Sequence, residues 1–99
     1  MTSRPLRVVL SREAESDIED IFLYGVEEHG VAAASGYVEG LREALARPTD
    51  HPFIGQRRDF IRAGLRRLVH RSHIAYYLVG DAEVVLRVEH TRRDRPAEP

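Results

Sequence analysis

The hydrophobic positions at the start of the chain change from a period of two to a helical period at Ser11. Three apolar residues at alternate positions predict a short strand before it, namely Leu6, Val8 and Leu10. Ser11 is a typical helix N-cap, and Glu13 and Glu15 follow in the first turn, where the helix dipole favours acidic side chains. We therefore predict a helix that begins after Ser11 and ends at His29-Gly30.

Both predicted helices have one apolar face. The first helix carries on it Ala14, Ile18, Ile21, Phe22 and Gly25. The second begins at about Val31, ends before Pro48 and carries Ala34, Tyr37, Val38, Leu41 and Leu45. The short link between them requires an antiparallel hairpin. Gly36 and Gly40 lie one turn apart in the second helix, which indicates either a close helix–helix approach or two solvent-facing positions.

Residues 48–63 are rich in turn formers, so we expect a loop with Phe53 and Ile54 tucked beneath it. Three strand-like runs follow Gly64, joined by a two-residue turn at Arg71-Ser72 and a three-residue turn at 80–82.

This register places most apolar residues of the three strands on one face, which we expect the helices to cover: Leu65, Val69, Ile74, Tyr76, Leu78, Val84, Leu86 and Val88. The opposite face is then polar, partly cationic and open, and it carries Arg66, His70, Ala75, Tyr77, Arg87 and Glu89.

The pattern predicts the α+β class: an antiparallel two-helix hairpin packed on one face of a mainly antiparallel β-sheet, in the order β-α-α-β-β-β. The 99 residues suffice for a single domain, with 95–99 as a flexible tail.

Composition narrows the function classes. The chain has no cysteine, which excludes disulfides, zinc–thiolate sites and iron–sulfur clusters. No apolar run reaches the roughly 18 residues of a membrane span, and no signal-peptide pattern is present. We expect an unexported cytoplasmic protein without a cofactor, a metal or a membrane partner.

The net charge of −1 conceals two oppositely charged halves. Nine acids oppose four arginines up to Ala46, and eleven arginines oppose seven acids from Arg47 onward, which gives −5 and +4. Six arginines lie between residues 57 and 71 with Asp59 as the one acid. They suit either nucleic acid or an acidic protein, and the near-neutral pI of about 6.5 favours the protein.

Motifs of nucleotide-binding proteins and classical hydrolases are absent, and the five histidines lack the spacing of a metal site. One catalytic arrangement remains: arginines around a phosphodiester and a histidine that moves protons, which would cleave RNA. Its residues are Arg66, Arg67, Arg71, Arg87 and either His70 or His90. A solvated sheet face explains the same arginines, and the alternation along the last strand favours His90 as a structural histidine at the edge of the core.

In their order and spacing, several segments of the chain resemble the ParE toxins of the RelE/ParE superfamily, the toxic halves of bacterial type II toxin–antitoxin modules. These segments are LSREAESDIEDIFLYGVEEHG, HPFIGQ, GLRRL and SHIAYYLVGDAEVVLRVEHTRRD. The resemblance covers about residues 6–94.

The resemblance implies a toxin that poisons DNA gyrase without covalent chemistry and is neutralised by a ParD-like antitoxin in a hetero-oligomer. The chain would contact operator DNA only indirectly, through the antitoxin. The residues expected to contact gyrase or antitoxin are Arg66, Arg67, Arg71, Tyr77, Arg87, Arg92 and Arg93.

The superfamily also contains RelE-like ribosome-dependent endoribonucleases, which implies an enzymatic alternative that uses Arg66, Arg87 and His90. Thr91 stands where those nucleases often have tyrosine, which favours the non-enzymatic toxin. A non-toxic interaction protein is the third hypothesis.

Overall fold

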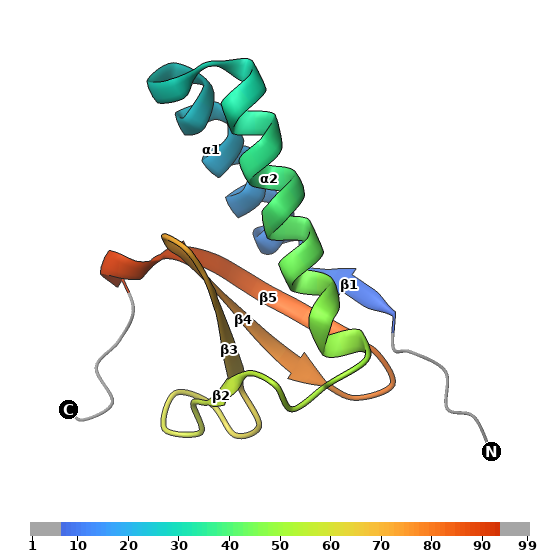
Figure 1. Cartoon of the computed structure of the whole chain (residues 1–99). Helices are drawn as coiled ribbons and strands as arrows, with labels where there is room; N and C mark the ends of the chain where they lie inside the picture. Colours follow the sequence, from blue (N-terminus) through green and yellow to red (C-terminus); the bar gives the residue numbers. More distant parts are fainter. Residues whose placement is uncertain (1–6, 94–99) are drawn as a thin grey trace.

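The computed structural model describes residues 7–93, with the side chain of Arg93 outside the described part. Leu6 of the predicted first strand and the predicted tail at 95–99 also lie outside it. Two helices rise from one side of a five-stranded sheet (Figure 1). The elements are β1 (Val8–Leu10), α1 (Arg12–His29), α2 (Val31–Ala46), η1 (Arg47–Thr49), β2 (Gln56–Arg57), β3 (Arg66–His70), β4 (His73–Val79), β5 (Glu83–His90) and η2 (Thr91–Arg93).

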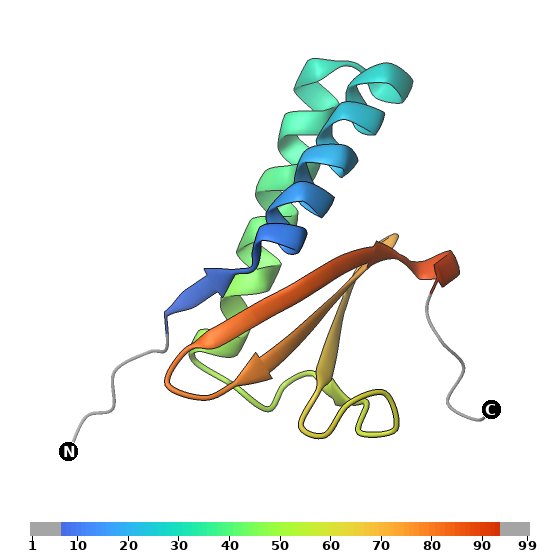
Figure 2. The ribbon, with the colours of Figure 1, turned by 180° about the vertical axis from the view of Figure 1, so that it is seen from behind.

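The sheet has the strand order β1-β5-β4-β3-β2, with β1 parallel to β5 and the other pairs antiparallel. The predicted fold class and element order are confirmed, with β2 as an additional short edge strand. Figure 2 shows β1 beside β5 at the base of the hairpin. No helix within residues 7–93 is long and apolar enough to cross a membrane.

The helix boundaries follow the capping signals. The backbone N–H of Ala14 donates to Ser11 Oγ at 2.9 Å, so Ser11 is the N-cap that the sequence predicts. Gly30 has a φ of 89° between the two helices, a left-handed value that favours glycine and reverses the chain. The close approach of the helices is at Gly25, where an added Cβ would lie 3.1 Å from Ala34 Cβ. Gly36 has no neighbour within 4 Å of such an atom.

Both predicted turns of the sheet are confirmed. His70 pairs with His73 around Arg71-Ser72, and Val79 pairs with Glu83 around residues 80–82. Arg71 takes a φ of 53° in the first of these turns.

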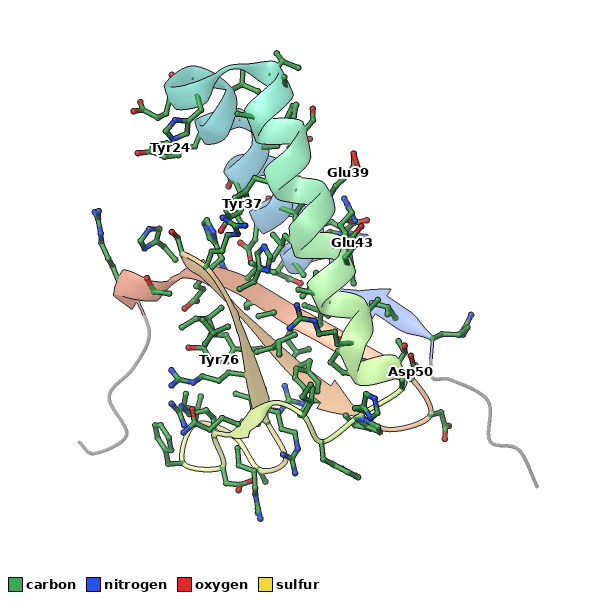
Figure 3. All side chains as sticks on the ribbon, viewed as in Figure 1. Tyr24, Tyr37, Glu39, Glu43, Asp50 and Tyr76 are labelled. Atoms are coloured by element: carbon green, nitrogen blue, oxygen red, sulfur yellow. The ribbon has the colours of Figure 1, made fainter. Side chains whose placement is uncertain are left out.

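The prediction of which face the helices cover is wrong. The helix-facing core contains Leu68, Ala75, Tyr77, Val85 and Val88 from the sheet, packed against Ala14, Ile18, Leu41, Ala44 and Leu45. The expected core residues instead form a second cluster of Leu65, Ile74 and Tyr76, with Ile61, Leu78 and Leu86 packed against it. Figure 3 shows Tyr76 on the side of the sheet away from α2. Both faces are apolar, so the alternation groups residues by face without deciding which face the hairpin covers.

A β-bulge explains why Val88 lies on the opposite face of the sheet from the residues predicted to share its face. Tyr76 pairs with Arg87, but Tyr77 pairs with Val85, which leaves Leu86 as an extra residue in β5. The bulge reverses the alternation of side chains beyond it. Strand β5 therefore supplies Leu86 to the open face and both Val85 and Val88 to the helix-facing core.

The expectation for the loop before β3 is also wrong. Phe53 is 69% exposed and Ile54 is 49% exposed, so neither side chain is tucked beneath the loop.

Candidate partner-binding site

A groove of about 710 Å³ lies between the helical hairpin and the ends of β4 and β5. We call it the hairpin–sheet groove. Its lining comes from α1 (Asp17, Asp20, Ile21, Tyr24, Gly25, His29), α2 (Ala33, Ala34, Tyr37), the sheet (Ser72, His73, Arg87, Val88, Glu89, His90) and Arg92. Figure 3 shows Tyr24 and Tyr37 projecting from the hairpin on the side of this opening. The floor is apolar and aromatic, and charged side chains of both signs surround it.

Aromatic side chains in contact close one end of the groove. Tyr37 Oη lies 2.7 Å from His73 Nδ1, and the rings of His73 and His90 meet edge-to-face at 5.3 Å between centroids. Tyr37 also meets the ring of His70 at 5.7 Å. These contacts join the adjacent ends of β3, β4 and β5 to α2, and they place His90 in the lining of the groove.

Burial favours the uncharged forms of Tyr37 and His73. Burial lowers the pKa of His73, and the neighbouring imidazoles of His90 and His70 disfavour a proton on it further. Burial also raises the pKa of Tyr37. The neutral phenol and imidazole can exchange a hydrogen bond with a peptide without adding charge.

Arg87 and Asp17 form the one ion pair between hairpin and sheet in the described part of the chain. Arg87 Nε and Nη2 donate to the carboxylate of Asp17 at 2.8 and 3.0 Å. The same carboxylate accepts the backbone N–H of Val88 at 2.8 Å. A bidentate pair of this kind is among the stronger polar contacts in proteins. Arg87 is therefore held by α1 rather than left open for a partner.

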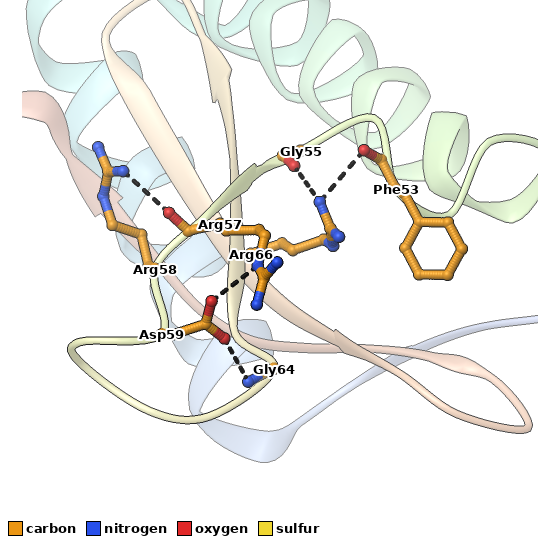
Figure 4. A network of polar contacts seen from close by, with 7 residues as sticks. All are labelled: Phe53, Gly55, Arg57, Arg58, Asp59, Gly64 and Arg66. Carbon is orange, nitrogen blue, oxygen red and sulfur yellow. Dashed lines mark hydrogen bonds and ion pairs between the residues drawn. The ribbon is translucent and has the colours of Figure 1, made fainter.

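Arg66 and Tyr77 hold the loop at residues 52–55. Arg66 Nη1 donates to the carbonyl oxygens of Gly55 and Phe53, at 2.8 and 3.3 Å (Figure 4). Tyr77 is completely buried, accepts the Gly55 N–H at 2.8 Å and donates to the Pro52 carbonyl oxygen at 3.1 Å. Both side chains have structural roles, and Tyr77 offers no surface to a partner.

The remaining predicted contact residues lie at separate places. Arg67 is on β3 and donates to Gln56 Oε1 at 3.0 Å, whereas Arg71 is exposed in the turn between β3 and β4. Arg92 is exposed at the mouth of the groove, and its backbone N–H donates to His90 Nδ1 at 3.1 Å. Arg93 belongs to η2, and its side chain lies outside the described residues.

The structure brings the expected nuclease residues together only in part: Arg87 and His90 line the groove, and Arg66 lies apart from them. His70, His73 and His90 lie in one row across the strands, and Arg66 lies four positions along β3 from it, which is roughly 13 Å. Arg87 is occupied by Asp17. Within residues 7–93, no group of three potential ligands is arranged to hold a metal ion.

Sequence reasoning missed Asp17, Tyr37 and His73 as groove residues. Tyr37 belongs to the predicted apolar face of α2, and Asp17 lies outside the predicted apolar face of α1. The sequence separation between these residues and their partners exceeds 30 positions, so no local pattern links them. The recurrence of histidine on both sides of the first turn and at the end of the last strand was the available signal.

Comparisons with known proteins agree with the resemblance. Residues 8–95 match the family model described as ParE toxin of type II toxin-antitoxin system, parDE. The chain is 37% identical over 81 residues to Toxin ParE1 of Caulobacter vibrioides, which covers 82% of this chain and 84% of that protein. It is also 37% identical over 90 residues to Toxin ParE1 of Mycobacterium tuberculosis, covering 89% and 92% of the two chains. The solved chromosomal ParDE system from P. aeruginosa has a similar fold, with a TM-score of 0.77 at 23% identity over 89% of this chain and 98% of that one.

Proposed function

From the premise that the chain belongs to the ParE family of toxins of type II toxin–antitoxin systems, we propose that it inhibits DNA gyrase and is neutralised by a ParD-like antitoxin. The observation that carries the proposal is the family match over residues 8–95, which spans both the hairpin and the sheet. The proposed inhibition proceeds by binding in the cytoplasm, without covalent chemistry.

The hairpin–sheet groove is the proposed antitoxin site. Its apolar floor contains Ile21 and Tyr24, and Tyr24 is 65% exposed although it is a large aromatic residue. An amphipathic segment of an antitoxin would bury these side chains and meet the uncharged Tyr37–His73 pair at the end of the groove. The relative from P. aeruginosa is described as a ParDE system, which supports an antitoxin as the partner.

Arg92 and Arg93 are the proposed gyrase contacts. They follow β5, and the exposed Arg92 side chain forms no ion pair with another described residue, unlike Arg87. An exposed arginine at such a position favours association with an acidic protein surface.

The proposal is tested with purified gyrase and relaxed plasmid. The chain should block supercoiling, and prior addition of the antitoxin encoded beside it should restore supercoiling. Tyr24→Ala should weaken antitoxin binding about tenfold while inhibition of gyrase persists. The double variant Arg92→Ala/Arg93→Ala should weaken inhibition severalfold.

Arg42→Ala is the matched control, because Arg42 is an exposed arginine on α2 outside the hairpin–sheet groove. It should change neither activity. Unimpeded supercoiling at concentrations that saturate the antitoxin would contradict the proposal.

Sequencing RNA ends after induction distinguishes the enzymatic alternative from the proposed gyrase inhibition. We expect intact transcripts, since Arg66 and Arg87 are engaged in internal contacts. Cuts positioned by codon would instead support the ribosome-dependent nuclease.

A further inference from the structure

The loop of residues 51–55, before β2, holds two large apolar side chains in solvent. Phe53 is 69% exposed and Ile54 is 49% exposed, and they are adjacent in the chain. Single exposed apolar residues are common on protein surfaces, whereas neighbouring ones form a patch of the kind that marks an interaction site. Figure 4 shows the Phe53 ring extending away from Gly55 and from the strands.

The rest of the protein fixes the backbone of this loop. Tyr77 Oη accepts one hydrogen bond from it and donates one to it, and Arg66 donates two more. The Ile54 N–H donates to the His51 carbonyl oxygen at 3.0 Å, which closes a turn. Gly55 has no room for a side chain, because an added Cβ would meet the Tyr77 hydroxyl. A surface that is ordered before binding loses less conformational entropy when a partner arrives.

Cations border the apolar pair. The Arg66 guanidinium lies 4.8 Å from the centroid of the Phe53 ring. Arg57 pairs with Arg66 across β2 and β3, and its exposed side chain forms an ion pair with Asp59. These contacts leave one positive charge in excess beside Phe53. An apolar pocket with a carboxylate at its rim would complement this surface.

The 51–55 loop lies away from the hairpin–sheet groove. Tyr77 holds the loop and His73 lines the groove, and these residues are four positions apart in β4, which is roughly 13 Å along the strand. None of residues 51–55 lines the groove. A segment of antitoxin bound in the groove would therefore leave Phe53 and Ile54 uncovered.

We propose that the 51–55 loop is a docking point for the target of the chain, with Phe53 and Ile54 inserted into an apolar pocket that has a carboxylate at its rim. This inference rests on the proposed function, in which the target is DNA gyrase. A loop whose conformation is set in the free chain suits a folded partner with a preformed pocket. A disordered antitoxin segment adapts to the surface that it meets, and a bilayer is fluid, so neither gains from a fixed loop.

The test measures the affinity of purified gyrase for the full chain by biolayer interferometry, together with inhibition of supercoiling. Phe53→Ala and Ile54→Ala should each weaken gyrase binding about tenfold, because anchors buried in a pocket dominate the binding energy of an interface. Both variants should bind the antitoxin encoded beside the chain with wild-type affinity, since the loop lies outside the groove. Circular dichroism verifies that each variant is folded.

Phe60→Ala is the matched control. Phe60 is also an exposed phenylalanine, at 52%, with a guanidinium group over its ring, that of Arg58. It lies outside the 51–55 loop, so its loss should change neither affinity.

A second variant tests the fixed backbone of the loop without touching the apolar pair. Tyr77→Phe keeps the buried ring but removes the hydroxyl group that bonds to Pro52 and Gly55. It should weaken gyrase binding severalfold and leave antitoxin binding unchanged.

Four outcomes would overturn the inference. If the wild-type chain inhibits gyrase and the double variant Phe53→Ala/Ile54→Ala inhibits it equally, the loop is not a docking point and the proposed function stands. If the wild-type chain neither binds nor inhibits gyrase, both fail. Loss of antitoxin binding in the loop variants, with gyrase binding unchanged, would assign the loop to the antitoxin. Phe53-dependent sedimentation with phosphatidylglycerol vesicles, again with gyrase binding unchanged, would assign it to a membrane.

Discussion

Glu83 is a carboxyl group buried without a counterion. It is completely inaccessible, and neither of its side-chain oxygens has a hydrogen-bond partner among the described residues. It lies at the start of β5, where its backbone N–H donates to the Arg7 carbonyl oxygen at 2.9 Å. Burial raises the pKa of Glu83 to about 7. The folded chain thus keeps this proton at a pH where the unfolded chain releases it.

This residue predicts a pH dependence of stability with a defined sign. The pKa of Glu83 rises on folding from 4.5 to about 7. The contribution of this group to the stability of the fold is therefore fully present below about pH 4.5 and is lost as pH rises through 7. The full effect is up to about 3 kcal/mol. Glu83→Gln should remove this pH dependence. The free energy of unfolding of the variant, measured in urea, should therefore rise relative to that of wild type between pH 5 and pH 8. A constant difference between the two proteins across that range would refute the assignment.

At the scale of elements, the helical hairpin depends on one close contact. Gly25 of α1 faces Ala34 of α2, and an added methyl group would lie 3.1 Å from the Ala34 Cβ. Gly36 is also inside a helix, but it is exposed and has open space where a side chain would begin. The two glycines share a helical propensity cost and differ in packing.

Replacing each glycine with alanine tests this difference. Gly36→Ala should stabilise the chain by about 1 kcal/mol and raise the melting temperature by about 4–8 °C. Gly25→Ala should give a smaller gain or a loss, because Ala34 must move to accept the methyl group. Thermal unfolding followed by circular dichroism measures both. Equal gains would show that the helices do not approach closely at Gly25.

Local signals predicted the elements well and their assembly only in part. Ser11, Gly30 and the turn at Arg71-Ser72 act within a few residues, so the sequence revealed the helix ends and the strand pairing. The bulge at Leu86 left no local signal, and two apolar sheet faces made the covered one ambiguous.

The candidate site was predictable as a set of residue types rather than as a geometry. The arginines of the second half were identified, but no pattern in the sequence indicated that Asp17 would engage Arg87 or that Arg66 would hold a loop. Such pairings are decided by residues far apart in the chain, which single-sequence periodicity does not report.

At the scale of the whole molecule, the charge is divided between the hairpin and the sheet. The half up to Ala46 carries −5 and the remainder +4. Among the described residues, Arg87 and Asp17 form the one ion pair that joins the two layers. The two layers therefore present most of their opposite charges to solvent and to partners.

This division predicts a salt-sensitive gain in stability from an acidic antitoxin. At a free antitoxin concentration about 1,000 times Kd, the complex should be more stable than the free chain by about 4 kcal/mol. Raising the salt concentration should reduce this gain, because screening weakens the attraction. Differential scanning calorimetry with and without the antitoxin measures it. Equal melting temperatures with and without the partner would contradict the expectation.

The contacts of α1 with β5 also affect how copies of the chain behave at high concentration. Strand β1 pairs only with residues 83–85, so the outer edge of β5 beyond them has no strand beside it in the described part of the chain. Ser11 Oγ donates to the Leu86 carbonyl oxygen, and Asp17 accepts the Val88 N–H, so side chains occupy backbone groups that a foreign strand would use. Unprotected strand edges template aggregation. Helix α1 therefore protects the edge of β5 from pairing with a strand of another copy. A chain without the Asp17 carboxylate would be prone to such polymerisation.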